Sequence, residues 1–111
     1  MKRLLACILL TFLTCVQALA SGESGARTVY MLVAASGGVR IQAPPGNGWN
    51  NPDNCTNSDS ILIVPNQAEK DAMVSFALAA QMRGTQISAS LSGCAAWGSI
   101  TYPKVGGLRA L

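Results

Sequence analysis

This chain has 111 residues, and the placement of the cysteines constrains its fold more than any other feature of the sequence. Cys7 and Cys15 lie in an N-terminal segment that has the pattern of a leader, whereas Cys55 and Cys94 lie in the rest of the chain. Two remaining cysteines permit one intramolecular pairing, and an oxidising compartment favours it over a free thiol pair or an intermolecular bridge. We therefore expect a Cys55–Cys94 disulfide. Its loop of about forty residues would contribute roughly 4 kcal/mol in the chain-entropy model.

The N-terminal segment has the three parts of a secretory signal peptide. A short positive start precedes a nearly continuous apolar run from Leu4 to Val16, and Ala18 and Ala20 provide the small residues that a signal peptidase reads. The run is shorter than the roughly twenty residues of a membrane-spanning helix. A membrane anchor and lipid attachment are the alternatives. We expect residues 1–20 to be a cleaved signal peptide and residues 21–111 to be a single secreted or periplasmic domain, with no stable membrane insertion of the mature chain.

Charge and composition exclude several functional classes. The full chain has eight Lys and Arg against five acidic residues, and removal of Lys2 and Arg3 leaves six against five. Because no basic cluster remains, we expect no nucleic-acid partner. The absence of histidine excludes His-based acid–base catalysis, Ser-His-Asp triads and the usual zinc ligands. We expect no enzyme activity, and so no catalytic residues, no metal and no cofactor.

One carboxylate pair keeps an enzymatic interpretation open. Asp53 and Asp59 flank Cys55, and two carboxylates can serve glycoside hydrolysis. The favoured alternative is that both carboxylates solvate a loop. Residues 53–59 are rich in oxygen ligands, which suggests a calcium site. The segment lacks the glycine at position six of an EF-hand loop, and Val64 stands where such a loop has an acidic residue at position twelve. The pattern therefore argues against an EF-hand calcium site.

Hydrophobic periodicity predicts a β-rich α+β domain. Alternating or apolar β-branched segments predict strands, Gly37-Gly38 predicts a hairpin turn, and a loop rich in Asn, Pro and Gly fills residues 44–58. A turn is expected around Trp97. The predicted strands cover residues 27–35, 39–43, 61–64 and 85–91, followed by short segments at 100–102 and 105–111.

One amphipathic helix is predicted from about Gln67 to Arg83. Asn66 offers an N-cap, and Glu69 stands three residues later, as in a capping box. Gly84 fits the C′ position that ends a helix.

Two tryptophans point to a ligand site. Trp49 lies in the polar loop beside Asn50 and Asn51, and Trp97 follows Cys94 in a glycine-flanked segment. An exposed indole stacks on the apolar face of a sugar while amides bond its hydroxyls. Trp49, Asn50, Asn51 and Trp97 are therefore the candidate ligand-binding residues. The alternative for each tryptophan is packing over the disulfide or against the core.

The second half of the chain resembles a known family. The capped helix, the alternating strand ending at Leu91, and the spacing of Cys94 and Trp97 resemble bacterial AB5 toxin B subunits of the cholera-toxin and subtilase-cytotoxin type. The pattern Ser92-Gly93-Cys94 followed by Tyr102-Pro103-Lys104 is also similar to small exported bacterial proteins of unassigned function.

The resemblance implies an OB-fold-like, five-stranded, partly open barrel of order β-β-β-α-β-β, with the helix across one end. It also implies a ring-shaped homopentamer that binds cell-surface glycans. Cys55 lies in mid-chain, whereas the corresponding cholera-type cysteine lies near the mature N-terminus. The sugar-binding residues of those toxins have no position-by-position match here.

These observations lead to three functional hypotheses. The first is a secreted or periplasmic, non-enzymatic binding module that recognises a glycan or a protein. The second is a structural or interaction protein of the envelope with an unknown partner. The third is a small hydrolase or an enzyme inhibitor.

Overall fold

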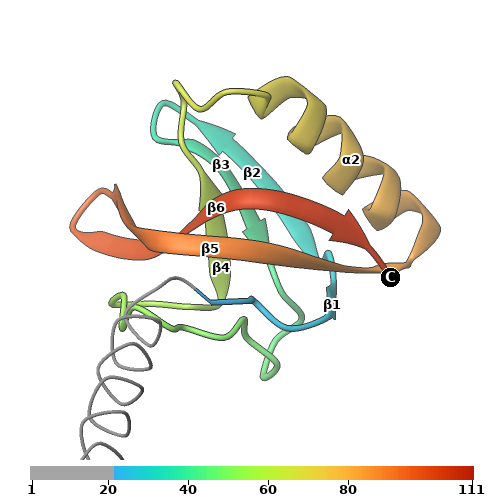
Figure 1. Ribbon diagram of the computed structural model, residues 1–111, viewed down its shortest axis with the longest axis horizontal. Helices are drawn as coiled ribbons and strands as arrows, with labels where there is room; N and C mark the ends of the chain where they lie inside the picture. The colour runs from blue at the N-terminus through green and yellow to red at the C-terminus, as the bar shows by residue number, and fades with distance from the viewer. Residues whose placement is uncertain (1–21) are drawn as a thin grey trace, which may run out of the picture.

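The computed structural model describes residues 22–111, so the predicted signal peptide lies outside the described residues. The domain is a curled, half-barrel sheet with one helix against it (Figure 1). Within residues 22–111 the elements are β1 (Arg27–Thr28), β2 (Met31–Ala35), β3 (Gly38–Gln42), β4 (Ser60–Ile63), α2 (Lys70–Arg83), β5 (Gln86–Trp97) and β6 (Ile100–Ala110).

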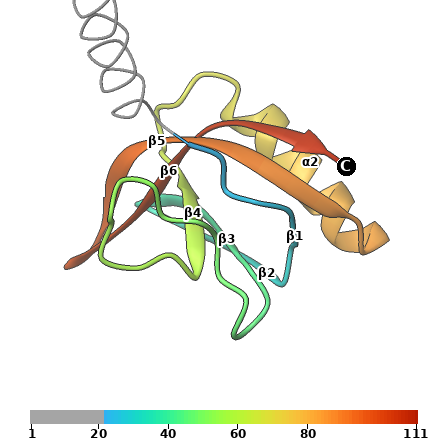
Figure 2. The same cartoon turned by 60° about the horizontal axis from the view of Figure 1, so that its bottom comes forward.

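The strand order in the sheet is β1-β5-β6-β4-β3-β2, and every pairing is antiparallel except β4 with β6. The two edge strands, β1 and β2, are consecutive in the chain (Figure 2). Thr28 pairs with Gln86 of β5, whereas Met31 pairs with Gln42 of β3. The single strand predicted over residues 27–35 is therefore two strands, because the chain changes partner between Thr28 and Met31. The described sheet has six strands rather than the expected five.

The concave side of the sheet and one side of α2 enclose the hydrophobic core. Alternation along β3 and β5 places Val39 and Ile41, and Ile87, Ala89 and Leu91, in this core, as the sequence predicts. From the helix, Met73, Ala77 and Ala80 are buried against it. Residues that face outward on the same strands include Arg40, which is partly exposed.

The helix begins three residues later than predicted. The predicted capping box is wrong, since Glu69 occupies the N-cap position with a left-handed φ of 62° and no side-chain cap forms. The side chain of Gln67 instead donates to the carbonyl of Val105 in β6, and residues 64–70 form turns. The C-terminal prediction is confirmed: Gly84 adopts a φ of 69°, and its N–H donates to the carbonyls of Ala80 and Gln81.

The last two strands are longer than predicted. β5 continues past Leu91 through an irregularity at Gly93, whose φ is 73°, and ends at Trp97 opposite Ile100. Pro103 lies inside β6, opposite Cys94, rather than ending a strand. The glycine bulge lets the ladder resume beyond the break in register.

The predicted disulfide is confirmed. Cys55 and Cys94 are bonded, with their Cα atoms 5.6 Å apart. The bond joins the long loop after β3 to β5, and so ties the two halves of the described chain together.

Candidate functional site

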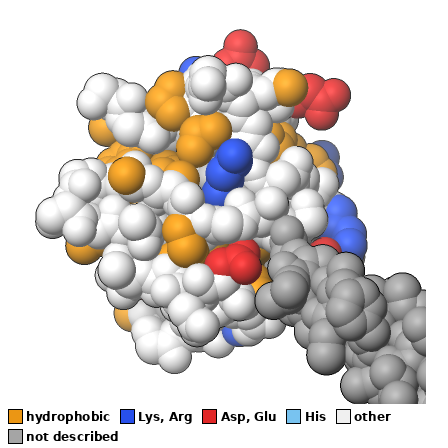
Figure 3. Space-filling view, turned by 60° about the vertical axis from the view of Figure 1, so that its left-hand side comes forward, with side chains coloured by type: hydrophobic (Ala, Val, Ile, Leu, Met, Phe, Trp, Pro, Cys, Tyr) orange, Lys and Arg blue, Asp and Glu red, His pale blue; other side chains and the backbone are white. Residues whose placement is uncertain are grey.

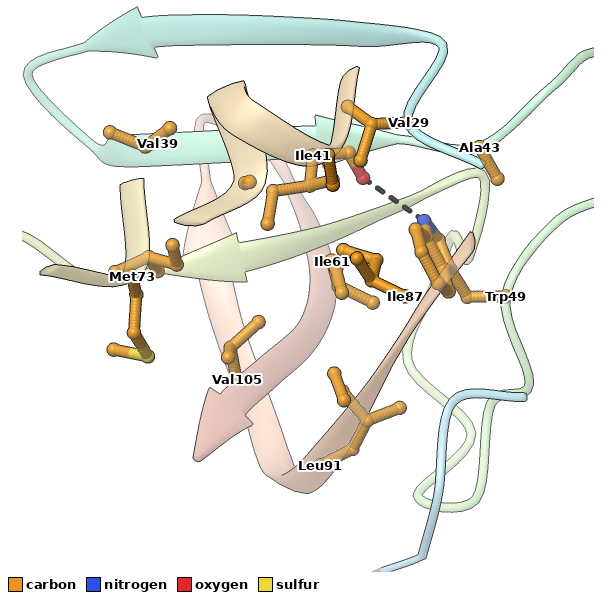
Figure 4. Close-up of a cluster of buried hydrophobic side chains, with 14 residues drawn as sticks. Val29, Val39, Ile41, Ala43, Trp49, Ile61, Met73, Ile87, Leu91 and Val105 are labelled. Atoms are coloured by element: carbon orange, nitrogen blue, oxygen red, sulfur yellow. Dashed lines mark hydrogen bonds between the residues drawn. The ribbon is translucent and has the colours of Figure 1, made fainter. Parts of the chain in front are cut away.

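Trp49 belongs to the core. Only 3% of its surface is exposed, and its indole Nε1 donates to the carbonyl of Ile41 at 3.0 Å (Figure 4). Its backbone N–H also donates to Ser58 at 2.8 Å. A ligand in solvent cannot stack on this ring, so its burial removes Trp49 from the candidate site. Its position matches the alternative considered above, in which the tryptophan packs against the core.

The two loop asparagines are used within the loop. The amide of Asn51 donates to the carbonyl of Cys55 and accepts from the N–H of Cys55, both at 2.8 Å, and thereby fixes the turn before the disulfide. Asn50 is exposed, and its backbone N–H donates to Ser24 at 2.8 Å. The structure therefore does not bring Asn50 and Asn51 together with Trp97.

Trp97 lies elsewhere, in a group that we call the aromatic–arginine cluster: Arg40, Trp97 and Tyr102. The guanidinium carbon of Arg40 lies 5.5 Å from the centroid of the Trp97 ring and 5.5 Å from that of Tyr102. Trp97 is partly exposed, whereas Tyr102 is buried. A guanidinium between two aromatic faces is a favourable cation–π arrangement.

Trp97 also rests on the β2–β3 turn. A Cβ atom built on Gly37 would lie 3.1 Å from Cε3 of Trp97, so the indole is seated directly on the glycine. This contact and the cation–π contact fix the plane of the ring. Any larger side chain at position 37 would displace it.

Arg40 has neutral polar partners. Its Nη1 donates to Ser60 Oγ at 3.1 Å and to the Tyr102 hydroxyl at 3.5 Å, and its buried Nε has no hydrogen-bond partner among the described residues. Arg40 makes no ion pair within residues 22–111, where Glu23 and Arg109 form the salt bridge at 2.6 Å. The cluster thus places the partly exposed guanidinium of Arg40 beside an aromatic ring, whereas Ser60 and Tyr102 are buried.

A second cation lies on the same face of the sheet. Arg40 pairs with Leu62 of β4, and Leu62 pairs with Lys104 of β6, so the three side chains share the outer face. Strand spacing puts the Cα atoms of Arg40 and Lys104 about 10 Å apart. Leu62 is fully buried although it faces away from the core, so the side chains of this face cover it. Figure 3 shows a basic side chain set among hydrophobic side chains on one side of the molecule.

Sequence patterns identified Trp97 but missed its partners. The alternation in residues 39–43 does place Arg40 on the polar face of its strand. No local signal indicates that Trp97, 57 positions later (97 minus 40), folds against it. Only the long-range pairing of β6 with β4 brings Tyr102 and Trp97 to β3.

Of the two candidate carboxylates, Asp53 has a structural role. Oδ2 of Asp53 accepts the N–H of Gly93 at 2.8 Å, next to the disulfide. Asp59 is exposed, and its backbone N–H donates to Asn57 at 2.9 Å. Across residues 22–111, no group of three or more Cys, Asp or Glu side chains is arranged to hold a metal ion.

Other hollows on the surface are shallow. Two depressions of about 150 and 180 Å³, both lined by Phe76, lie between α2 and the end of β6. Another of about 180 Å³ is lined by Ser88, Ser90 and Arg109. None of these three contains a residue of the aromatic–arginine cluster.

In the part of the chain that the structure describes, no helix has the length and apolar character needed to cross a membrane. Comparisons with protein-family models, with curated proteins and with solved structures find no match to this chain.

Proposed function

We propose that this chain is a secreted or periplasmic, non-enzymatic binding module that recognises glycans through the aromatic–arginine cluster. The observation that carries the proposal is the Trp97 ring, which is partly exposed and contacts both Arg40 and Gly37. Such a ring offers a flat apolar surface to a sugar, while the adjacent guanidinium N–H groups bond the sugar hydroxyls. The leader pattern and the disulfide support an oxidising compartment.

The strand topology supports an OB-like fold as part of the proposal. If β1 and β2 are taken as one bent strand, the sheet has five strands, and that first strand pairs with both β3 and β5. In the chain, the helix follows β4 and precedes β5. The parallel pair β4–β6 joins the strands β2, β3 and β4 to the strands β6, β5 and β1. A five-stranded, partly open Greek-key barrel has this character. Assembly into a toxin-B-like homopentamer belongs to the same proposal.

Glycan-array binding by residues 21–111 tests this function. We expect binding to be lost in Trp97→Ala and largely kept in Trp97→Phe, which retains an aromatic face. Tyr30→Ala is the matched control, because Tyr30 is an exposed aromatic residue outside the cluster. A silent array with folded protein contradicts glycan recognition. Equal binding by Trp97→Ala and the parent chain contradicts the assignment of the site.

A second candidate is a protein-interaction role in the envelope, favoured by the exposed face of α2. Leu78 and Met82 are 46% and 80% exposed, four positions apart on the helix. Molar mass in solution separates a pentamer from a monomer. If Leu78→Asp with Met82→Asp changes that mass while glycan binding is unaffected, this face mediates assembly.

A further inference from the structure

The end of the β5–β6 hairpin projects beyond the rest of the sheet. We call residues 92–103 the hairpin arm. Outside it, β5 pairs with β1 at Arg27 and Thr28, with a further bridge from Glu23 to Ser90, and β6 pairs with β4 at Lys104. Among the described residues the strands of the arm pair only with each other. An isolated two-stranded hairpin is at best marginally stable, so other contacts must hold the arm in place.

The segment 53–57 supplies those contacts. Cys55 is bonded to Cys94, and the carboxylate of Asp53 accepts the N–H of Gly93 at 2.8 Å. These two links hold the start of the arm, at the bulge where its direction changes.

Thr56 holds the arm nearer its end. The N–H of Thr56 donates to Thr101 Oγ1 at 3.0 Å, and the N–H of Thr101 donates to Thr56 Oγ1 at 2.6 Å. The N–H of Asn57 adds a bond to the carbonyl of Thr101 at 3.0 Å. Thr101 precedes Tyr102 in β6 and pairs with Ala96, the neighbour of Trp97. The links thus end at a residue adjacent to Tyr102, whose partner across the ladder is adjacent to Trp97.

The contacts within the cluster are less directional than these links. Arg40 reaches the Tyr102 hydroxyl at 3.5 Å, which is long for a hydrogen bond. The guanidinium lies at an ordinary cation–π distance of 5.5 Å from both ring centroids. The reciprocal bonds of Thr56 with Thr101 are shorter and directional. Gly37 and Arg40 therefore orient the Trp97 ring, whereas the segment 53–57 holds the backbone of the arm.

We propose that Thr56, in a segment locked by the Cys55–Cys94 disulfide, is a positioning residue that holds Trp97 against Arg40. Loss of the Thr56 bonds lets the arm move while the core stays intact. The consequence for ligand binding rests on the proposed function, whereas the positioning of Trp97 does not.

Fluorine NMR of protein labelled with 5-fluorotryptophan tests the positioning without a ligand. The chain has two tryptophans, so two resonances are expected, and Trp97→Phe assigns them. In Thr56→Val we expect the Trp97 resonance to move toward the value of solvent-exposed indole, and the buried Trp49 resonance to stay. Thr101→Val should produce the same shift. Thr85→Val is the matched control, because Thr85 is exposed and outside the arm.

An unchanged Trp97 resonance in both Thr56→Val and Thr101→Val overturns the proposal. Movement of the Trp49 resonance in both variants overturns it too, since the segment would then stabilise the whole domain rather than the arm. If the parent chain binds a glycan, Thr56→Val should weaken that binding about fivefold, the effect of one hydrogen bond. A shifted Trp97 resonance with no glycan binding by the parent chain supports the positioning and counts against the proposed function alone.

Discussion

At the scale of single residues, the two tryptophans have different physical roles. Trp49 satisfies its indole N–H on a backbone carbonyl inside the core, so it provides apolar area without leaving a buried donor unpaired. Trp97 covers a guanidinium at the surface and keeps part of its ring in solvent. The same residue type thus stabilises the fold in one place and forms the proposed binding surface in the other.

Truncation should separate these roles. We expect Trp49→Ala to lower the free energy of unfolding by about 3–5 kcal/mol, since a large buried ring is replaced by a cavity. Trp97→Ala should cost about 1 kcal/mol or less, because its ring is partly exposed and its cation–π contact is modest. Urea unfolding followed by circular dichroism measures both values. Similar losses in the two variants would show that Trp97 is as structural as Trp49.

At the scale of elements, the start of α2 carries a strained residue. Glu69 has a positive φ of 62° just before the helix, without a capping bond from its side chain. A left-handed conformation costs a residue with a Cβ roughly 1–2 kcal/mol, and glycine adopts it freely. The sequence pattern of a capping box is therefore present at a place where the backbone does not use it.

Replacing Glu69 with glycine should stabilise the domain. We expect Glu69→Gly to raise the free energy of unfolding by about 0.5–1 kcal/mol, since relief of strain exceeds the entropy that glycine adds to the unfolded chain. Thermal and urea unfolding measure the change. Glu69→Ala, which removes the carboxylate but keeps a Cβ, should give no such gain. A stabilised alanine variant would point to charge rather than backbone conformation.

Local patterns predicted the parts of the fold that depend on near neighbours. The alternation of β3 and of the first half of β5, and the glycine that ends α2, follow from residue spacing and backbone preference. The break between β1 and β2 depends on two distant partners, Gln86 and Gln42, and the extension of β5 depends on pairing with β6. For the same reason, only Trp97 of the four candidate ligand residues lies in the cluster, and Arg40 and Tyr102 required the three-dimensional structure.

At the scale of the whole molecule, one covalent bond spans a sheet whose strands are joined mainly by long-range pairs. The Cys55–Cys94 bond closes a loop with a sequence separation of 39 residues. The chain-entropy model assigns such a bond about 4 kcal/mol. Domains have net stabilities of roughly 5–15 kcal/mol, so this bond supplies a large share.

Removing the bond should therefore bring the domain close to its unfolding transition. We expect Cys55→Ala with Cys94→Ala to lose about 4 kcal/mol in urea unfolding, and to show a larger dependence of free energy on urea because its unfolded chain is less compact. A phosphine reductant should weaken the parent chain in the same way and leave the double variant unchanged. If the reductant also destabilised the double variant, the loss of stability in the parent chain would not come from the disulfide.

The position of β1 and β2 at opposite edges of the sheet also sets an order of folding events. A chain that emerges N-terminus first can assemble the antiparallel run β2-β3-β4 early, since each strand pairs with the next. β1 must wait, because its partner residues Gln86 and Ile87 lie beyond the helix. Until β5 and β6 emerge, β4 also lacks its second neighbour. The non-local pairings slow folding, so the partly synthesised chain exposes unpaired strand edges until β6 has appeared.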